Sequence, residues 1–175
     1  MTFEQQLHTD LHQHFLLLGK VDEHFPECPD VEQRWQAIAQ SYAPDGIREF
    51  AQYPTASLGW MMYVGMAVTR YWDDDWTYYS HLADLYTHVR DKRGYDNLDD
   101  YVRQEVLHLS GDDYDAAERL VADTAERVYA ALRHQHIEPG TPEAFKAYVA
   151  CLHQLYLMGM ALELHHLGYH MHKLK

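Results

Sequence analysis

Apolar residues recur along most of the chain at the spacing of an α-helix, and two segments are apolar on nearly every side. Residues 50–69 contain no Asp, Glu, Lys or Arg, and residues 147–172 contain only Glu163. A helix that is apolar all round has to be surrounded by other helices or by lipid. The pattern therefore predicts two core helices, over residues 54–73 and 142–172, with the remaining helices packed around them.

Capping and turn residues divide the rest of the chain into shorter amphipathic helices. Thr2 and Gln5 have the spacing of a capping box. The segment Ala43-Pro44-Asp45-Gly46 predicts a turn. The three aspartates at 73–75 predict the end of one core helix and the cap of the next helix. The helices predicted outside the core cover approximately residues 3–18, 31–42, 73–93, 98–109 and 114–134.

These segments predict an all-α fold, a helical bundle of about four longer helices plus two or three short ones. No stretch of useful length alternates apolar and polar residues as a half-buried strand does. The chain of 175 residues is expected to form a single domain over residues 1–175, because that length supports a sizeable core without disulfides or metals.

The acidic composition limits the classes of partner. A net charge of −13 disfavours binding to a phosphate backbone, so we expect no nucleic-acid partner. Residues 50–69 are long enough to span a membrane, but Gln52, Pro54 and Ser57 dilute them, so we expect a core helix and no membrane association. Two distant cysteines and the absence of a leader-like N-terminus favour a cytoplasmic protein.

Two charged residues are isolated within the apolar segments. Arg70 is the only charged residue in positions 50–72, and Glu163 is the only one in positions 147–172. Because burying an unpaired charge is costly, we expect Arg70 and Glu163 to form a pair between the core helices. The alternative is that each side chain reaches water at a helix end.

Histidine is unusually frequent, with 14 residues in the chain, and some histidines lie at ligand spacing. On a continuous helix, positions i, i+3 and i+7 fall within one narrow arc. Imidazole and carboxylate ligands together suit Zn, Fe, Ni or Cu, so a divalent transition metal is one hypothesis. Chance spacing on solvated helix faces is the leading interpretation, so no cofactor is expected, and the metal is the alternative. The candidate ligands are Glu163, His166 and His170, then His81, Asp84 and His88, with His8 and His12 as additional ligands.

A third group combines aromatic and acidic side chains at the predicted helix junction. Trp72, Asp73, Asp74 and Trp76 are candidates for the lining of a pocket there. Paired carboxylates can transfer protons or hold Mg²⁺ through water. The competing interpretation is that the aspartates only cap helices.

The leading functional hypothesis is a non-catalytic domain that binds a protein partner or its own copy as a homo-oligomer. A metal-binding or metal-dependent helical protein is the first alternative. A carrier of a small apolar ligand in the aromatic core is the second alternative. No nucleophile elbow or phosphate loop is present, so the sequence leaves open whether the protein is an enzyme.

The histidines also predict a response to pH. Protonation of all 14 would move the formal charge from −13 to +1. Since imidazoles titrate near pH 6.5, we expect stability and self-association to change between about pH 5 and 7. In an acidic protein, exposed histidines are expected to have a raised pKa.

Overall fold

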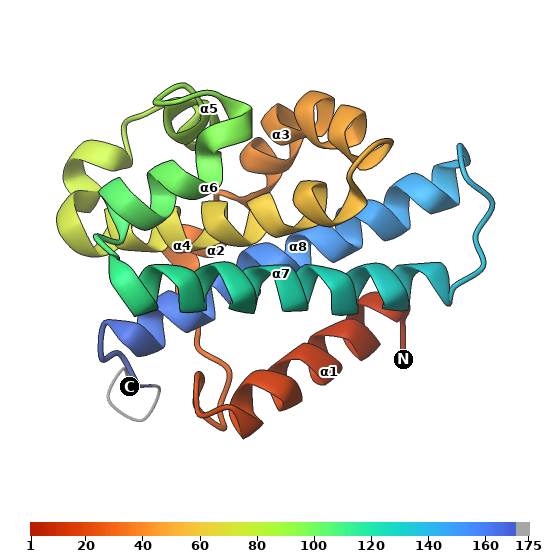
Figure 1. Ribbon diagram of the computed structural model, residues 1–175, viewed down its shortest axis with the longest axis horizontal. Helices are drawn as coiled ribbons and strands as arrows, with labels where there is room; N and C mark the ends of the chain where they lie inside the picture. Colours follow the sequence, from red (N-terminus) through yellow and green to blue (C-terminus); the bar gives the residue numbers. More distant parts are fainter. Residues whose placement is uncertain (171–175) are drawn as a thin grey trace.

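Two long helices form the centre of the structure, as the apolar segments predict. The computed structural model describes residues 1–170, in which α4 (Pro54–Tyr79) and α8 (Pro142–His166) pack along each other (Figure 1). A Cβ atom on Gly65 would overlap the carbonyl oxygen of Tyr156, and one on Gly159 would overlap that of Met62. The two glycines therefore allow the helix backbones to touch.

The other helices cover this central pair. α1 (Phe3–Leu17) packs on α8, whereas α3 (Trp35–Phe50) and α7 (Gly111–Arg133) pack mainly on α4. Residues 1–170 contain no strand, so the prediction of an all-α helical bundle is confirmed. The short elements are α2 (Pro29–Glu32), α5 (Leu85–Arg90), η1 (Tyr95–Asn97), α6 (Leu98–Tyr101) and the π-helical turn η2 (Val102–Val106).

α8 is the most apolar of the long helices. It is the one helix within residues 1–170 that is long and apolar enough to cross a membrane. In this structure 78% of that stretch is buried inside the protein. Burial of this kind is what the core helix of a bundle requires. Length and composition alone do not distinguish a core helix from a membrane-spanning helix.

The predicted turn at residues 43–46 is wrong, because α3 continues through Pro44 to Phe50. Proline removes a helix hydrogen bond and usually breaks a helix. Here the following turn is held by buried contacts. Ser57 Oγ donates a hydrogen bond of 2.8 Å to the Gly46 carbonyl, and a Cβ on Gly46 would lie 2.5 Å from the Tyr148 hydroxyl. Tertiary packing at this position outweighs local propensity.

The helix predicted over residues 73–93 is also wrong. α4 continues past the first two aspartates, and only Asp75 leaves helical geometry, with φ −162° and ψ 75°. Asp75 then accepts a hydrogen bond of 3.2 Å from the Tyr78 amide, which caps the final turn of α4. The chain turns over residues 80–84, and α5 begins at Leu85 with Asp84 as its cap.

Candidate metal site at the ends of two helices

The end of α8 is set by a glycine. The core helix predicted to reach residue 172 ends at His166, and residues 171–172 lie outside the described part of the chain. Gly168 has a φ of 90°, and the amides of Gly168 and Tyr169 donate to the carbonyls of His165 and Leu164 at 3.0 and 2.9 Å. This is a Schellman motif, in which a left-handed glycine reverses the chain. His170 is thereby returned towards His165.

The end of α1 is built in the same way. Gly19 has a φ of 69°, and the amides of Gly19 and Lys20 donate to the carbonyls of Leu16 and Phe15, each at 3.0 Å. α1 and α8 run in the same direction in Figure 1, so both reversals occur at the same end of the molecule. The loop that follows α1 therefore meets the segment that follows α8.

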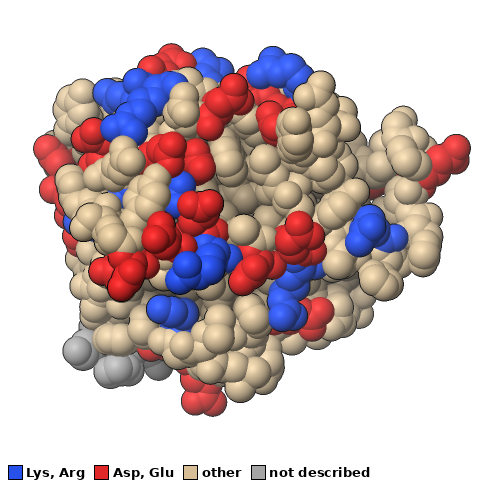
Figure 2. All heavy atoms as spheres, in the orientation of Figure 1, with Lys and Arg blue, Asp and Glu red and all other residues tan. Residues whose placement is uncertain are grey.

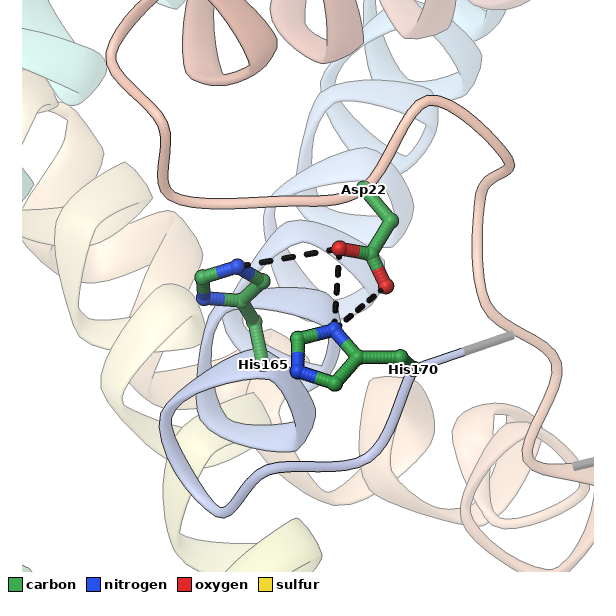
Figure 3. Close-up of side chains that lie close together, drawn as sticks. All are labelled: Asp22, His165 and His170. Carbon is green, nitrogen blue, oxygen red and sulfur yellow. Dashed lines mark hydrogen bonds and ion pairs between the residues drawn. The ribbon is translucent and has the colours of Figure 1, made fainter. Parts of the chain in front are cut away.

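Asp22, His165 and His170 converge at this meeting point, as Figure 3 shows. His170 Nδ1 lies 3.0 and 2.9 Å from the two carboxylate oxygens of Asp22. His165 Nε2 lies 3.7 Å from Asp22 Oδ1. One nitrogen or oxygen atom from each residue lies within 4.8 Å of the other two. The three side chains are each about 30% exposed, so solvent reaches the cluster.

His12 fixes the loop that carries Asp22. Its Nε2–H donates a hydrogen bond of 2.8 Å to the backbone carbonyl of Asp22. The His12 ring packs edge-on against Phe25, with ring centroids 5.4 Å apart. Val21, beside Asp22, is only 4% exposed. The Asp22 carboxylate is therefore presented by an ordered and partly buried segment.

This arrangement offers the ligands that a divalent transition metal prefers. Two imidazole nitrogens and one carboxylate suit Zn²⁺, Fe²⁺, Ni²⁺ or Cu²⁺. Bonds of about 2.0–2.2 Å in tetrahedral geometry place ligand atoms roughly 3.3–3.6 Å apart. The distances from Asp22 Oδ1 to the two histidines, 3.0 Å to His170 and 3.7 Å to His165, lie on either side of this spacing. A metal at this position would replace the proton that His170 shares with Asp22. Residues 1–170 offer three ligands at this position, and a tetrahedral ion takes a fourth ligand beside them.

The structure pairs Arg70 with Glu163 but separates Glu163 from the other predicted ligands on α8. Arg70 Nη1 lies 3.3 Å from Glu163 Oε2. Glu163 is 4% exposed, and this burial raises its pKa to about 7 against the opposing effect of Arg70. His166 is exposed at the end of α8, and His170 lies beyond the chain reversal. The predicted face of three ligands is therefore not formed, because the helix that carries Glu163 and His166 ends before residue 170.

The structure does not place His81, Asp84 and His88 on one helix face either. His81 lies in the turn after α4 and is exposed. Asp84 accepts a hydrogen bond of 2.6 Å from Ser41 Oγ and caps α5. His88 packs edge-on against the ring of Tyr71, with centroids 5.6 Å apart. Asp84 and His88 instead line an open depression of about 340 Å³.

His8, the remaining predicted ligand, lies further along α1. Its Nδ1 is 2.8 Å from Gln154 Oε1, and its ring lies 6.2 Å from that of His12. Neither His8 nor His12 contributes an atom to the cluster of three.

The aromatic and acidic residues predicted to line a pocket contact other side chains, and Tyr169 touches both Trp72 and Asp73. Trp72 Nε1 donates a hydrogen bond of 3.1 Å to Asp30, and Asp73 accepts one of 2.6 Å from the Tyr169 hydroxyl. Asp74 Oδ1 lies 3.6 Å from Arg70 Nε. The Trp76 ring lies 5.0 Å from the Arg34 guanidinium. The two depressions described on residues 1–170 are lined by other residues.

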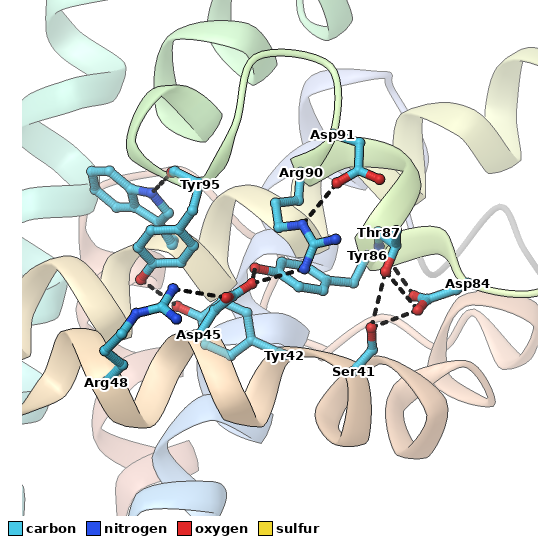
Figure 4. A network of polar contacts seen from close by, with 11 residues as sticks. Ser41, Tyr42, Asp45, Arg48, Asp84, Tyr86, Thr87, Arg90, Asp91 and Tyr95 are labelled. Carbon is cyan, nitrogen blue, oxygen red and sulfur yellow. Dashed lines mark hydrogen bonds and ion pairs between the residues drawn. The ribbon is translucent and has the colours of Figure 1, made fainter.

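A second polar cluster joins α3 to α5 and is structural in character (Figure 4). Asp45 accepts hydrogen bonds from Tyr86 at 2.6 Å, Arg90 at 3.2 Å and Arg48 at 2.9 Å. Burial by itself would raise the pKa of Asp45, but these donors outweigh it and lower the pKa. A carboxylate so fully satisfied has little capacity left for a ligand.

Two of the three residues in the candidate metal site, Asp22 and His165, were not among the sequence-derived candidates. Asp22 lies in a loop, where the spacing of residues along the sequence does not predict which side chains come close together in space. Gly168 could have indicated that His165 and His170 lie close together. A glycine at this position is a helix stop, which would have ended α8 near Leu167. Comparison of the chain with protein-family profiles, curated proteins and solved structures finds no match. The function is therefore inferred from the geometry of the site alone.

Proposed function

We propose that this protein binds one divalent transition-metal ion through Asp22, His165 and His170. The observation that carries this proposal is the convergence of a carboxylate and two imidazoles, although Asp22 and His170 are 148 positions apart in the sequence. A hydrogen bond explains the contact of His170 with Asp22. It does not explain His165, because 3.7 Å is too long for a hydrogen bond.

Zn²⁺ is the first metal to test, because it accepts two imidazoles, one carboxylate and a water molecule in tetrahedral geometry. Calorimetric titration of the metal-stripped full chain with ZnCl₂ at pH 7.5 should give a stoichiometry of one. Asp22→Asn and His165→Gln should each weaken binding by more than about 100-fold, since even the loss of residues that only support a ligand costs 10–100-fold.

His166→Gln is the matched control, because His166 is the exposed neighbour of His165 at the end of the same helix. This variant should bind zinc as the unmodified protein does. Equal affinity of all variants would show that zinc binds to other surface histidines, and the proposal would then be wrong.

A further inference from the structure

The N-terminal arm, residues 3–28, consists of α1 and the loop that follows it. Its apolar face carries Leu7, Leu11 and Phe15, which are 2%, 0% and 0% exposed. Polar contacts join the start of the arm to the middle of α8. Glu4 accepts hydrogen bonds from His153 at 2.6 Å and from Gln154 at 2.7 Å.

The far end of the arm meets α8 at Asp22. The backbone carbonyl of Asp22 is bound by His12 of the arm, and its carboxylate faces His165 and His170. Beyond the arm, the chain is fixed by the Tyr156 hydroxyl, which donates a hydrogen bond of 2.7 Å to the Val31 carbonyl. The arm thus has an anchored base, and the three ligands are together in the arrangement in which the arm lies on α8.

We propose that a metal ion at Asp22, His165 and His170 latches the N-terminal arm onto α8. This inference rests on the proposed metal site and adds a regulatory role to it. One ligand belongs to the arm and two belong to the segment around the end of α8, so the ion binds the closed arm alone. At a free ion concentration 100 times its Kd, the population with an open arm should fall about 100-fold. Metal availability then sets how often Leu7, Leu11 and Phe15 are uncovered.

Hydrogen exchange of the full chain, followed by mass spectrometry, tests the latch. In metal-stripped protein, amides of residues 7–15 should exchange at least about tenfold faster than amides of residues 58–68 in α4, because the arm opens without global unfolding. Zinc at 100 times its Kd should slow exchange of residues 7–15 by about 100-fold, or until they match the core. The His166→Gln protein should respond equally, whereas Asp22→Asn and His165→Gln should not respond. Circular dichroism establishes that each variant is folded.

The outcomes separate the two proposals. If calorimetry shows zinc at the site but exchange of residues 7–15 is unchanged, the latch is wrong and the metal site stands. If residues 7–15 exchange no faster than the α4 core in the metal-free protein, the arm does not open separately and the latch is again wrong. If zinc does not bind the full chain, both proposals fail.

Discussion

Glu163 is a buried carboxyl group whose charge state near neutral pH depends on its surroundings. Burial raises its pKa to about 7, and the attraction of Arg70 only partly opposes this rise. Arg70 is itself shared, because Asp74 lies 3.6 Å from its Nε and is 54% exposed. The carboxyl group of Glu163 is therefore about half protonated near pH 7. Its ion pair with Arg70 is weaker than the distance of 3.3 Å suggests.

The raised pKa of Glu163 predicts a stability that falls as pH rises from about 4.5 to 7. In this interval the folded state keeps the Glu163 proton that the unfolded state has lost. The contribution of Glu163 to stability is therefore greatest below the pKa of the unfolded state, and it is lost as pH rises through the pKa of the folded state. The loss should be on the order of 3 kcal/mol. Glu163→Gln has a neutral side chain at all pH values. In urea titrations, the free energy of unfolding of the natural chain should therefore decrease relative to that of the variant between pH 5 and 7.5. A difference independent of pH would contradict the assignment.

The contact between Arg70 and Glu163 predicts energetic coupling. Glu163→Ala should destabilise the protein by about 3 kcal/mol, because it leaves Arg70 with only the exposed Asp74. Adding Arg70→Met should recover about 1–2 kcal/mol of this loss, as measured by a double-mutant cycle in urea. Asp74→Asn is the control and should cost less than about 1 kcal/mol, as expected for an exposed ion pair. If the stability losses of the two single variants simply add up in the double variant, there is no energetic coupling between Arg70 and Glu163.

Charged residues could be identified from the sequence only where they were isolated. Arg70 and Glu163 stand out within apolar segments, and the structure brings them together. Arg103 is only 1% exposed but was missed, because the charged residues around it in the sequence suggest a solvated face. In the structure its partners are the neighbouring Asp99 and Asp100, at 3.3 and 3.0 Å, and the more distant Glu118 of α7, at 2.9 Å. Burial of a charge inside a polar segment leaves no pattern in the sequence.

At the scale of elements, the glycines within and just after α4 and α8 have three different roles. Gly65 and Gly159 lie against the opposite backbone. Gly59 instead faces α7, where a Cβ would lie 3.1 Å from a methyl group of Val121. Gly168 reverses the chain after α8. Glycine content alone could not distinguish these three roles, because each depends on how the helices are placed.

Replacing Gly159 by alanine should therefore destabilise the fold. The new methyl group would overlap the Met62 carbonyl, and the helices would have to separate. Overpacking of this kind costs about 1–3 kcal/mol, and the better helix propensity of alanine returns only about 1 kcal/mol or less. Gly59→Ala is the control on the partner helix and should be neutral to within about 0.5 kcal/mol, because its nearest neighbour is a side-chain methyl group. Equal stability of the two variants in thermal unfolding would contradict the close contact.

The elements themselves were largely predictable, and their boundaries were not. Apolar periodicity located the long helices, because burial of a continuous face is visible in the sequence. Pro44 and the aspartates at 73–75 are strong local signals for breaks, yet α3 and α4 continue through them. In both cases contacts with distant residues hold the helix, and such contacts are not encoded in local propensity.

At the scale of the whole molecule, the face seen in Figure 2 carries both signs of charge. In the view of Figure 2, acidic and basic side chains alternate over α7 and the neighbouring helices. Two partly buried histidines have a lowered pKa: His14 by burial and then by Arg127, and His88 by burial and then by Lys92. A lowered folded pKa means that the unfolded state takes up protons first, so these two groups reduce stability below about pH 6.5. They oppose the effect expected of exposed histidines.

Self-association should follow the net charge. At pH 7 a formal charge of −13 opposes the association of copies, and protonation of histidines weakens that repulsion as pH approaches the sequence pI of about 5.4. Light scattering at low ionic strength should show a reversible rise in mass between pH 7 and 5.5. A variant with four exposed histidines replaced by glutamine tests this, at His24, His81, His134 and His166. Protonation of its remaining ten histidines raises the formal charge no higher than −3, so association should shift to lower pH. Added salt at about 0.5 M should weaken the pH dependence by screening. A mass that stays constant across this range, or one that rises equally in the variant, would show that histidine charge does not control association.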